Sequence, residues 1–112
     1  MKNVFKAMIL AAPLLAPLPG HSDGYVMGAG RWPCSKVVEV IDGEHTGDYF
    51  QMAGWILGFW SRESLDQGDA FNNKLEEVGG AGIFQFTTEA CRKVAPETLL
   101  YELTQQIIES SH

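Results

Sequence analysis

The sequence TGDYFQMAGWILGFWSRESL, residues 46–65, carries the strongest pattern in this chain of 112 residues. Its apolar side chains recur at steps of three and four residues, as on one face of an α-helix: Tyr49, Met52, Ala53, Ile56, Phe59 and Trp60. Phe50, Trp55 and Leu57 extend this face around the helix. A helix that is apolar around so much of its circumference is expected at the centre of the domain.

The aromatic residues of this helix allow two interpretations. Core packing is the favoured interpretation, because a helix that is apolar around most of its circumference buries most of its side chains against neighbouring elements. Alternatively, one aromatic strip binds a partner, since aromatic rings supply a large contact area. Phe50 and Trp60 are then the residues expected to be most exposed. The candidate protein-binding residues are Phe50, Trp55, Phe59 and Trp60.

Shorter elements surround the central helix. Residues 35–42 are rich in Val and Ile, which favours a strand, but a single strand has no partner here and Pro33 can open a helix. We therefore predict a short helix. Residues 67–73 are expected to form a loop, followed by a short helical turn that Gly79 and Gly80 end.

Two further helices complete the pattern. Residues 81–95 are predicted to be helical, with a buried stripe of Ile83, Phe86, Ala90 and Val94 and with Phe84 and Cys91 beside it. Ala95 should end this helix because Pro96 follows it. Residues 97–109 form the last helix, whose buried side is Leu99, Leu100, Leu103, Ile107 and Ile108. The expected fold is all-α: a single small bundle of about four helices.

The first 22 residues have the layout of a cleaved secretory signal peptide. Lys2 and Lys6 supply a positive region, and an apolar stretch at residues 7–18 follows. This stretch is too short to span a bilayer, which needs about 20 apolar residues. Residues 23–112 are then the single mature domain, and residues 23–33 are an extended lead-in that becomes fixed at Cys34.

The chain has two cysteines, Cys34 and Cys91. An even number of cysteines in a short exported chain predicts a disulfide, and disulfides persist in oxidising compartments such as the bacterial periplasm. In the chain-entropy description, closing this loop is worth roughly 4 kcal/mol. The domain is accordingly expected to be periplasmic and covalently stapled.

The charge of the chain excludes some partners. Loss of Lys2 and Lys6 with the signal leaves 6 basic residues against all 14 acidic ones, a net charge near −8. Phosphate backbones and anionic lipid surfaces are bound mainly through clustered Lys and Arg. We therefore expect neither nucleic-acid binding nor a membrane partner.

Catalytic groups are sparse in this sequence. His45 lies in a polar turn near Glu44 and Asp48, where a solvated loop is the better interpretation than a cation site. Ser61 and Ser64 lack the strand-turn-helix context of a nucleophile, and the glycines at 79, 80 and 82 lack the Lys and Ser/Thr of a phosphate loop. We expect no enzyme activity, no metal and no cofactor.

Two short motifs carry a resemblance to a known family: Trp55-x-x-Gly58-Phe59 and Cys91-x-x-x-x-Pro96. Over residues 30–110 the chain resembles the small HdeA-like periplasmic proteins, which include acid-stress chaperones and, more distantly, the Tai-type immunity proteins that block secreted amidases. The resemblance implies a compact helical fold whose disulfide joins the first and penultimate helices. Immunity members often carry additional cysteines, which this chain lacks.

These observations lead to a functional expectation. The chain is predicted to be a non-enzymatic periplasmic domain that binds protein, with an HdeA-like acid-stress chaperone as the first hypothesis. Protonation of carboxylates that are paired in the folded state would loosen it at low pH. The alternative is an immunity protein that inhibits a secreted toxin. The partner is thus a misfolded client or a specific toxin, and a homodimer is left open.

Overall fold

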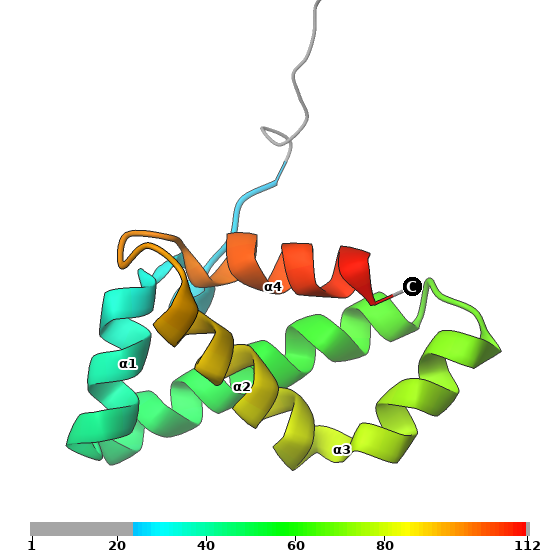
Figure 1. Cartoon of the computed structure of the whole chain (residues 1–112), viewed down its shortest axis with the longest axis horizontal. Helices are drawn as coiled ribbons and strands as arrows, with labels where there is room; N and C mark the ends of the chain where they lie inside the picture. Colours follow the sequence, from blue (N-terminus) through cyan, green and yellow to red (C-terminus); the bar gives the residue numbers. More distant parts are fainter. Residues whose placement is uncertain (1–23, 112) are drawn as a thin grey trace, which may run out of the picture.

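The regular elements of the computed structural model are all helices (Figure 1). The structure describes residues 24–111, so the predicted signal peptide at residues 1–22 lies outside the described residues. The elements in chain order are η3 (Gly28–Arg31), α1 (Cys34–Gly43), α2 (Thr46–Ser64), α3 (Asp69–Ala90), η4 (Cys91–Lys93) and α4 (Leu100–Ser110). The predicted all-α class with about four helices is confirmed.

Helix α1 confirms the helical interpretation of residues 35–42. It begins directly after Pro33 and ends at Gly43, where Glu44 turns the chain with a left-handed φ of 57°. Cys34, Val37 and Val40 are spaced by three residues and are all buried. That spacing places them on one face of a helix, whereas a strand would direct them to opposite sides.

Helix α2 is the central helix, as predicted. It packs against η3, α1 and α3, and Figure 1 shows α1 at one end of it and the second half of α3 crossing in front of it. Met52, Ile56 and Trp60 are its buried residues. Burial on several sides is what the broad apolar circumference of this segment requires.

The predicted loop at residues 67–73 is wrong from Asp69 onward, because α3 begins there. Asp69 lies in the first turn of α3, where a negative charge is favourable. Phe71 is buried, and its ring stacks on that of Trp60 with centroids 6.3 Å apart. Contact with a distant aromatic residue therefore stabilises a helical turn that local polarity disfavours.

The predicted break at Gly79 is confirmed. Helix α3 contains one non-helical residue, Gly79, with φ 81° and ψ 163°. Only glycine adopts this conformation readily. The two halves of α3 consequently form the V seen in Figure 1.

The second half of α3 is shorter than predicted, and it buries a different face from the one predicted. The α-helix ends at Ala90, and a 3₁₀ turn at Cys91–Lys93 replaces the expected continuation to residue 95. Phe86 was expected on the buried stripe but is 55% exposed. The buried residues are Ile83, Thr87 and Thr88, because Thr87 faces Trp60 of α2 and accepts a hydrogen bond from its indole N–H.

Helix α4 begins at Leu100, three residues later than predicted. The carbonyls of Pro96 and Thr98 accept hydrogen bonds from the first amides of α1, which holds residues 96–98 outside the helix. The predicted apolar side of α4 is otherwise present, with Leu100, Leu103 and Ile108 buried.

The lead-in before Cys34 is ordered earlier than predicted. Ala29 and Gly30 of η3 are buried, and Gly30 lies so close to Trp55 that a Cβ atom there would overlap the indole ring. The expectation of an extended lead-in up to Cys34 is therefore wrong for residues 28–31, which pack onto α2.

Replacing the glycine at the bend of α3 tests its conformational role. A Cβ atom at Gly79 would meet nothing within 4 Å, so Gly79→Ala changes the backbone alone. We expect this variant to lower the free energy of unfolding in urea by about 1–3 kcal/mol.

The matched control is Gly58→Ala in α2, where a Cβ atom also meets nothing within 4 Å but the backbone is helical. We expect this variant to raise the free energy of unfolding by about 0.5–1 kcal/mol. Equal effects of the two substitutions would show that the bend does not depend on glycine.

Candidate protein-binding site

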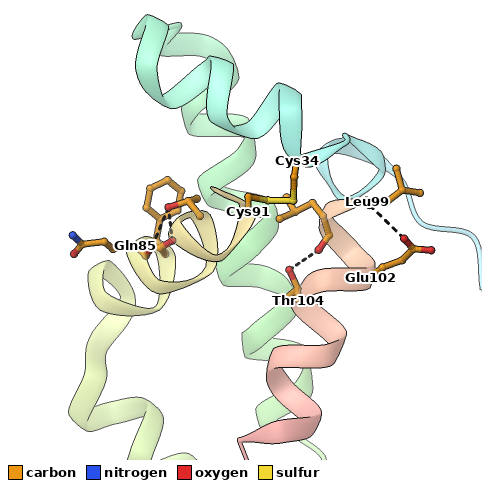
Figure 2. Close-up of a disulfide and its surroundings, with 9 residues drawn as sticks. Cys34, Gln85, Cys91, Leu99, Glu102 and Thr104 are labelled. Carbon is orange, nitrogen blue, oxygen red and sulfur yellow. Dashed lines mark hydrogen bonds between the residues drawn. A yellow bond between two sulfur atoms is a disulfide. The ribbon is translucent and has the colours of Figure 1, made fainter. Parts of the chain in front are cut away.

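The predicted disulfide joins the start of α1 to the turn that follows α3. Cys34 is the first residue of α1 and Cys91 the first of η4, with their Cα atoms 5.0 Å apart. Both are buried. Figure 2 shows the bond that joins these two elements, with the start of α4 close to it. The pairing of Cys34 with Cys91 is confirmed.

Backbone hydrogen bonds reinforce this point of the fold. The amides of Cys34 and Ser35 donate to the carbonyls of Thr98 (2.8 Å) and Pro96 (2.9 Å). The first amides of a helix have no partner within it, so the loop before α4 satisfies those of α1. The amide of Leu100 in turn donates to the carbonyl of Trp32 over 2.9 Å. We call the disulfide and these three bonds the disulfide junction.

The first turn of α4 is held at the same place. The Leu99 amide donates to Glu102 Oε1 over 3.3 Å, and the Thr104 hydroxyl donates to the Leu100 carbonyl over 2.7 Å (Figure 2). The carboxylate of Glu102 thus satisfies an amide at the helix start, where a negative charge is also favourable. The disulfide junction therefore fixes the start of α4 relative to the start of α1.

An ion pair ties the far end of α1 to the same turn. Arg92, next to Cys91, donates two hydrogen bonds to Asp42, from Nη2 to Oδ1 over 2.7 Å and from Nη1 to Oδ2 over 3.2 Å. Its Nε also lies 3.5 Å from Glu89 Oε2. Within residues 24–111 the remaining ion pair, Arg62 with Asp66, is local to one helix end.

The ion pair changes the titration of both partners. Hydrogen bonds from Arg92 hold the pKa of Asp42 below its ordinary value of 3.8. The same bonds raise the pKa of Arg92 above its ordinary value. Asp42 is thus charged at neutral pH and loses its charge only below its ordinary pKa of 3.8.

A groove of about 590 Å³ lies between α1, α2 and α3. Its wall is largely apolar and includes Ile41, Tyr49, Ala53, Leu57, Ala81 and Phe84. Glu89 also lines the groove, and its carboxylate lies 3.5 Å from Arg92 Nε. We call this feature the α1–α3 groove. Arg92 and Asp42 do not line it, but Asp42 follows the lining residue Ile41 and Arg92 contacts the lining residue Glu89.

Phe50 extends the groove to the surface. It is 68% exposed, and its ring meets that of Tyr49 edge to face with centroids 5.6 Å apart. The ring of Tyr49 is in turn 5.2 Å from that of Phe84. Three aromatic rings therefore run from the inside of the groove to exposed surface.

The other three aromatic residues predicted to bind protein do not line the α1–α3 groove. Trp55 and Phe59 stack on each other with centroids 4.9 Å apart and are half-buried, with Trp55 beneath Gly30 of η3. Trp60 is only 4% exposed, and its Nε1 donates to Thr87 Oγ1 over 3.3 Å. The second half of α3 covers Trp60, which agrees with the favoured core-packing interpretation; its exposure was expected only where the aromatic strip faces a partner.

Sequence reasoning missed three parts of this site. Ile41 and Phe84 were not named as binding residues, and the pairing of Arg92 with Asp42 was not foreseen. Tyr49 was placed with the core face of α2, which is partly correct because it is half-buried. The available signal was the presence of Tyr49 and Phe50 side by side at the start of a helix that is apolar around most of its circumference.

The other candidate groups do not assemble into a reactive centre. His45 is exposed in the turn between α1 and α2, and the Ser64 hydroxyl donates to the Ser61 carbonyl over 2.7 Å. Among residues 24–111, no three His, Cys, Asp or Glu side chains are grouped so that they could hold a metal ion. In that same range no helix is long and apolar enough to cross a membrane.

Comparisons with known proteins give little further information. No family model and no solved structure matches the chain. Among curated proteins, the mouse protein mono-ADP-ribosyltransferase PARP9 is 30% identical over 78 residues, which are 66% of this chain and 9% of that protein. Because so small a part of that protein is matched, the similarity does not show family membership. The resemblance to HdeA-like proteins stays a prediction.

Removing the disulfide tests how much the domain depends on it. The bond closes a loop with a sequence separation of 57 residues, for which the chain-entropy description gives roughly 4 kcal/mol. We expect a double Cys34→Ala, Cys91→Ala variant to lose about that much free energy of unfolding in a urea titration.

The control is the same variant with a thiol reductant, which should have no further effect. Reduced wild-type protein should match the double variant. Wild-type stability that is unaltered by reduction would contradict this account.

Proposed function

We propose that this chain is a non-enzymatic, exported domain that acts as an acid-stress chaperone of the HdeA-like kind and binds apolar segments of misfolded proteins in the α1–α3 groove. One observation carries the proposal: Asp42, the titratable partner of Arg92, directly follows Ile41, which lines the aromatic groove. A fall in pH thus acts on a contact next to the end of α1 that lines the groove.

The sign of the pH effect follows from the pKa of Asp42. Because its pKa is lowered in the folded state, the ion pair stabilises the fold above the ordinary carboxyl value of 3.8. This contribution is lost as the pH falls through the lower, folded value. Loosening by this route is therefore expected below about pH 4 and not at neutral pH.

The two attachments of α1 respond differently to acid. The disulfide junction holds its start covalently, whereas Arg92 holds its end through a titratable partner. When Asp42 is protonated, the end of α1 that carries Ile41 loses its ion pair and is held by apolar contacts alone. We expect this end to move away from α2 and α3, which widens the groove beside Tyr49 and Phe84.

The charge of the whole chain acts in the same direction. With 14 acidic residues and the 6 basic ones that remain without Lys2 and Lys6, protonation of the carboxylates converts a net negative domain into a net positive one. Repulsion among the remaining positive charges opposes the compact state. The disulfide limits this expansion, so a partly open, client-binding state is expected instead of full unfolding.

The disulfide also supports the proposed location. Disulfides form and persist in oxidising compartments and are rare in the cytosol. A periplasmic location, reached by means of the signal peptide predicted at residues 1–22, fits a buried Cys34–Cys91 bond.

The chaperone proposal is tested by titrating the wild-type protein from pH 7 to pH 2. The dye ANS reports exposed apolar surface, and light scattering reports aggregation of an acid-denatured client. We expect both ANS binding and suppression of aggregation to appear below about pH 4, where Asp42 loses its charge. A protein that binds neither dye nor client at any pH would contradict the proposal.

A substitution at the ion pair tests the role of that contact. Asp42→Asn removes the charge that Arg92 binds, so we expect the acid-induced increase in ANS binding to begin at a higher pH than in the wild type. The matched control is Asp66→Asn, which breaks the local pair with Arg62 and should leave the midpoint unchanged. Equal midpoints for all three proteins would show that the ion pair does not control opening.

The alternative function, an immunity protein, predicts a different result. An immunity protein would bind one secreted toxin enzyme tightly in a fixed ratio at pH 7 and would not need acid. Stoichiometric inhibition of such an enzyme, with no client protection at low pH, would replace the chaperone proposal.

A further inference from the structure

A short segment at the start of the described chain covers two aromatic residues of α2. Residues 24–31, which we call the lead-in strap, comprise an irregular stretch followed by η3. Helix η3 packs against α2 and α4, and Figure 1 shows the strap in blue beside the start of α4. The strap lies against Trp55, whose ring stacks on that of Phe59. An aromatic pair that the sequence predicted to bind protein is thus partly covered by the chain itself.

Few contacts hold the strap in place. Ala29 and Gly30 are its buried residues, whereas Tyr25 is 77% and Met27 is 67% exposed. Within residues 24–111, no backbone hydrogen bond joins the strap to one of the α-helices. The Arg31 guanidinium lies 5.8 Å from the ring centroid of Tyr25, which belongs to the strap itself. Little buried apolar surface and few hydrogen bonds are typical of a segment that opens locally while the rest of a domain stays folded.

The contact with Trp55 admits only a residue without a side chain. A Cβ atom added at Gly30 would lie 2.3 Å from the Trp55 ring and 2.7 Å from Val26 Cγ1. Glycine permits this close approach of the backbone because it has no Cβ atom. A segment that takes the place of the strap therefore needs a glycine at this point, with an aliphatic residue four positions before it, as Val26 is placed here.

The open side of the strap adds a preference for charge. A cavity of about 650 Å³ lies between the strap and α4, and Val26 and Phe59 are apolar residues of its lining. Arg31 shares this lining with Glu102 and Glu109 and is its one basic residue. Opposite charges around one cavity attract each other and favour a partner of matching charge. The surface therefore favours a segment that carries a basic residue directly after its glycine.

We propose that the lead-in strap is an intramolecular competitor for a peptide-binding surface. When the strap is released, Trp55 and Phe59 bind an apolar segment of another protein. The preferred segment resembles the strap: an aliphatic residue, a glycine four positions later, and a basic residue directly after that glycine. This surface is independent of the chaperone proposal, because neither Trp55 nor Phe59 lines the α1–α3 groove and the exchange of one segment for another does not need acid.

A buried charge in the strap tests whether it can be released. Ala29 is fully buried, so Ala29→Asp buries an unpaired carboxylate that release of the strap returns to water. In ¹H–¹⁵N spectra at pH 7 we expect the indole N–H signal of Trp55 to shift and that of Trp60 to stay. The matched control is Met27→Asp, which adds the same charge at an exposed position of the strap and should shift neither signal. An unchanged Trp55 signal in Ala29→Asp would overturn the proposal.

A synthetic peptide of residues 24–31 with blocked ends measures the preference of the released surface. Its affinity is recorded by NMR titration of the labelled protein at pH 7. We expect saturable binding to the Ala29→Asp protein and at least about tenfold weaker binding to the wild type, whose own strap competes at high effective concentration. A peptide with Gly30→Val should bind at least about tenfold more weakly, and one with Arg31→Glu about threefold more weakly. No saturable binding, or equal binding of the parent and either altered peptide, would overturn the proposal.

Amide exchange of the wild-type protein covers the case in which the Ala29→Asp variant fails to fold. The Trp32 amide donates to the Ala29 carbonyl over 2.9 Å, whereas the Leu100 amide donates to the Trp32 carbonyl within the disulfide junction. Release of the strap breaks the first bond and leaves the second. After correction for intrinsic rates, we expect the Trp32 amide to exchange at least about tenfold faster than that of Leu100. Equal exchange of the two amides would show that the strap opens only when the domain unfolds, and would overturn the proposal.

Discussion

The disulfide junction is the constraint on which the other contacts of this domain depend. One covalent bond and three backbone hydrogen bonds join the start of α1, the end of α3 and the start of α4. Segments that are far apart in the sequence are thereby held at one place, and α2 packs beside them as the central helix. In a domain this small, such a staple replaces part of the stability that a larger apolar core would supply.

The two ends of α1 are attached with different strength, and this difference supports the proposed function. The start of α1 is covalently attached, whereas its end depends on apolar packing and on one titratable ion pair with Arg92. Acid weakens the second attachment without affecting the first. A groove lined by aromatic side chains lies at the weaker end. Under the proposed function, this end of α1 is the place at which the domain opens while its remaining contacts persist.

Much of the fold could be predicted because its signals are local. The periodicity of α2, the even number of cysteines and the break at Gly79 are each readable from a few neighbouring residues. The start of α3 at Asp69, the exposure of Phe86 and the late start of α4 could not be predicted, since each depends on distant partners such as Trp60 or the amides of α1. The candidate site was less predictable for the same reason. Phe50 was foreseen as an exposed residue, but Phe84 reaches the groove, and Arg92 reaches Asp42, only through tertiary structure.

The central claim is that acid opens the end of α1 while the disulfide junction stays closed. Amide hydrogen exchange of the oxidised wild-type protein at pH 7 and pH 3, corrected for the intrinsic effect of pH, tests this claim most directly. The account predicts that protection falls first at residues 40–44 and persists at Cys34 and Leu100. Uniform loss of protection across the domain, or unchanged protection at residues 40–44, would contradict it.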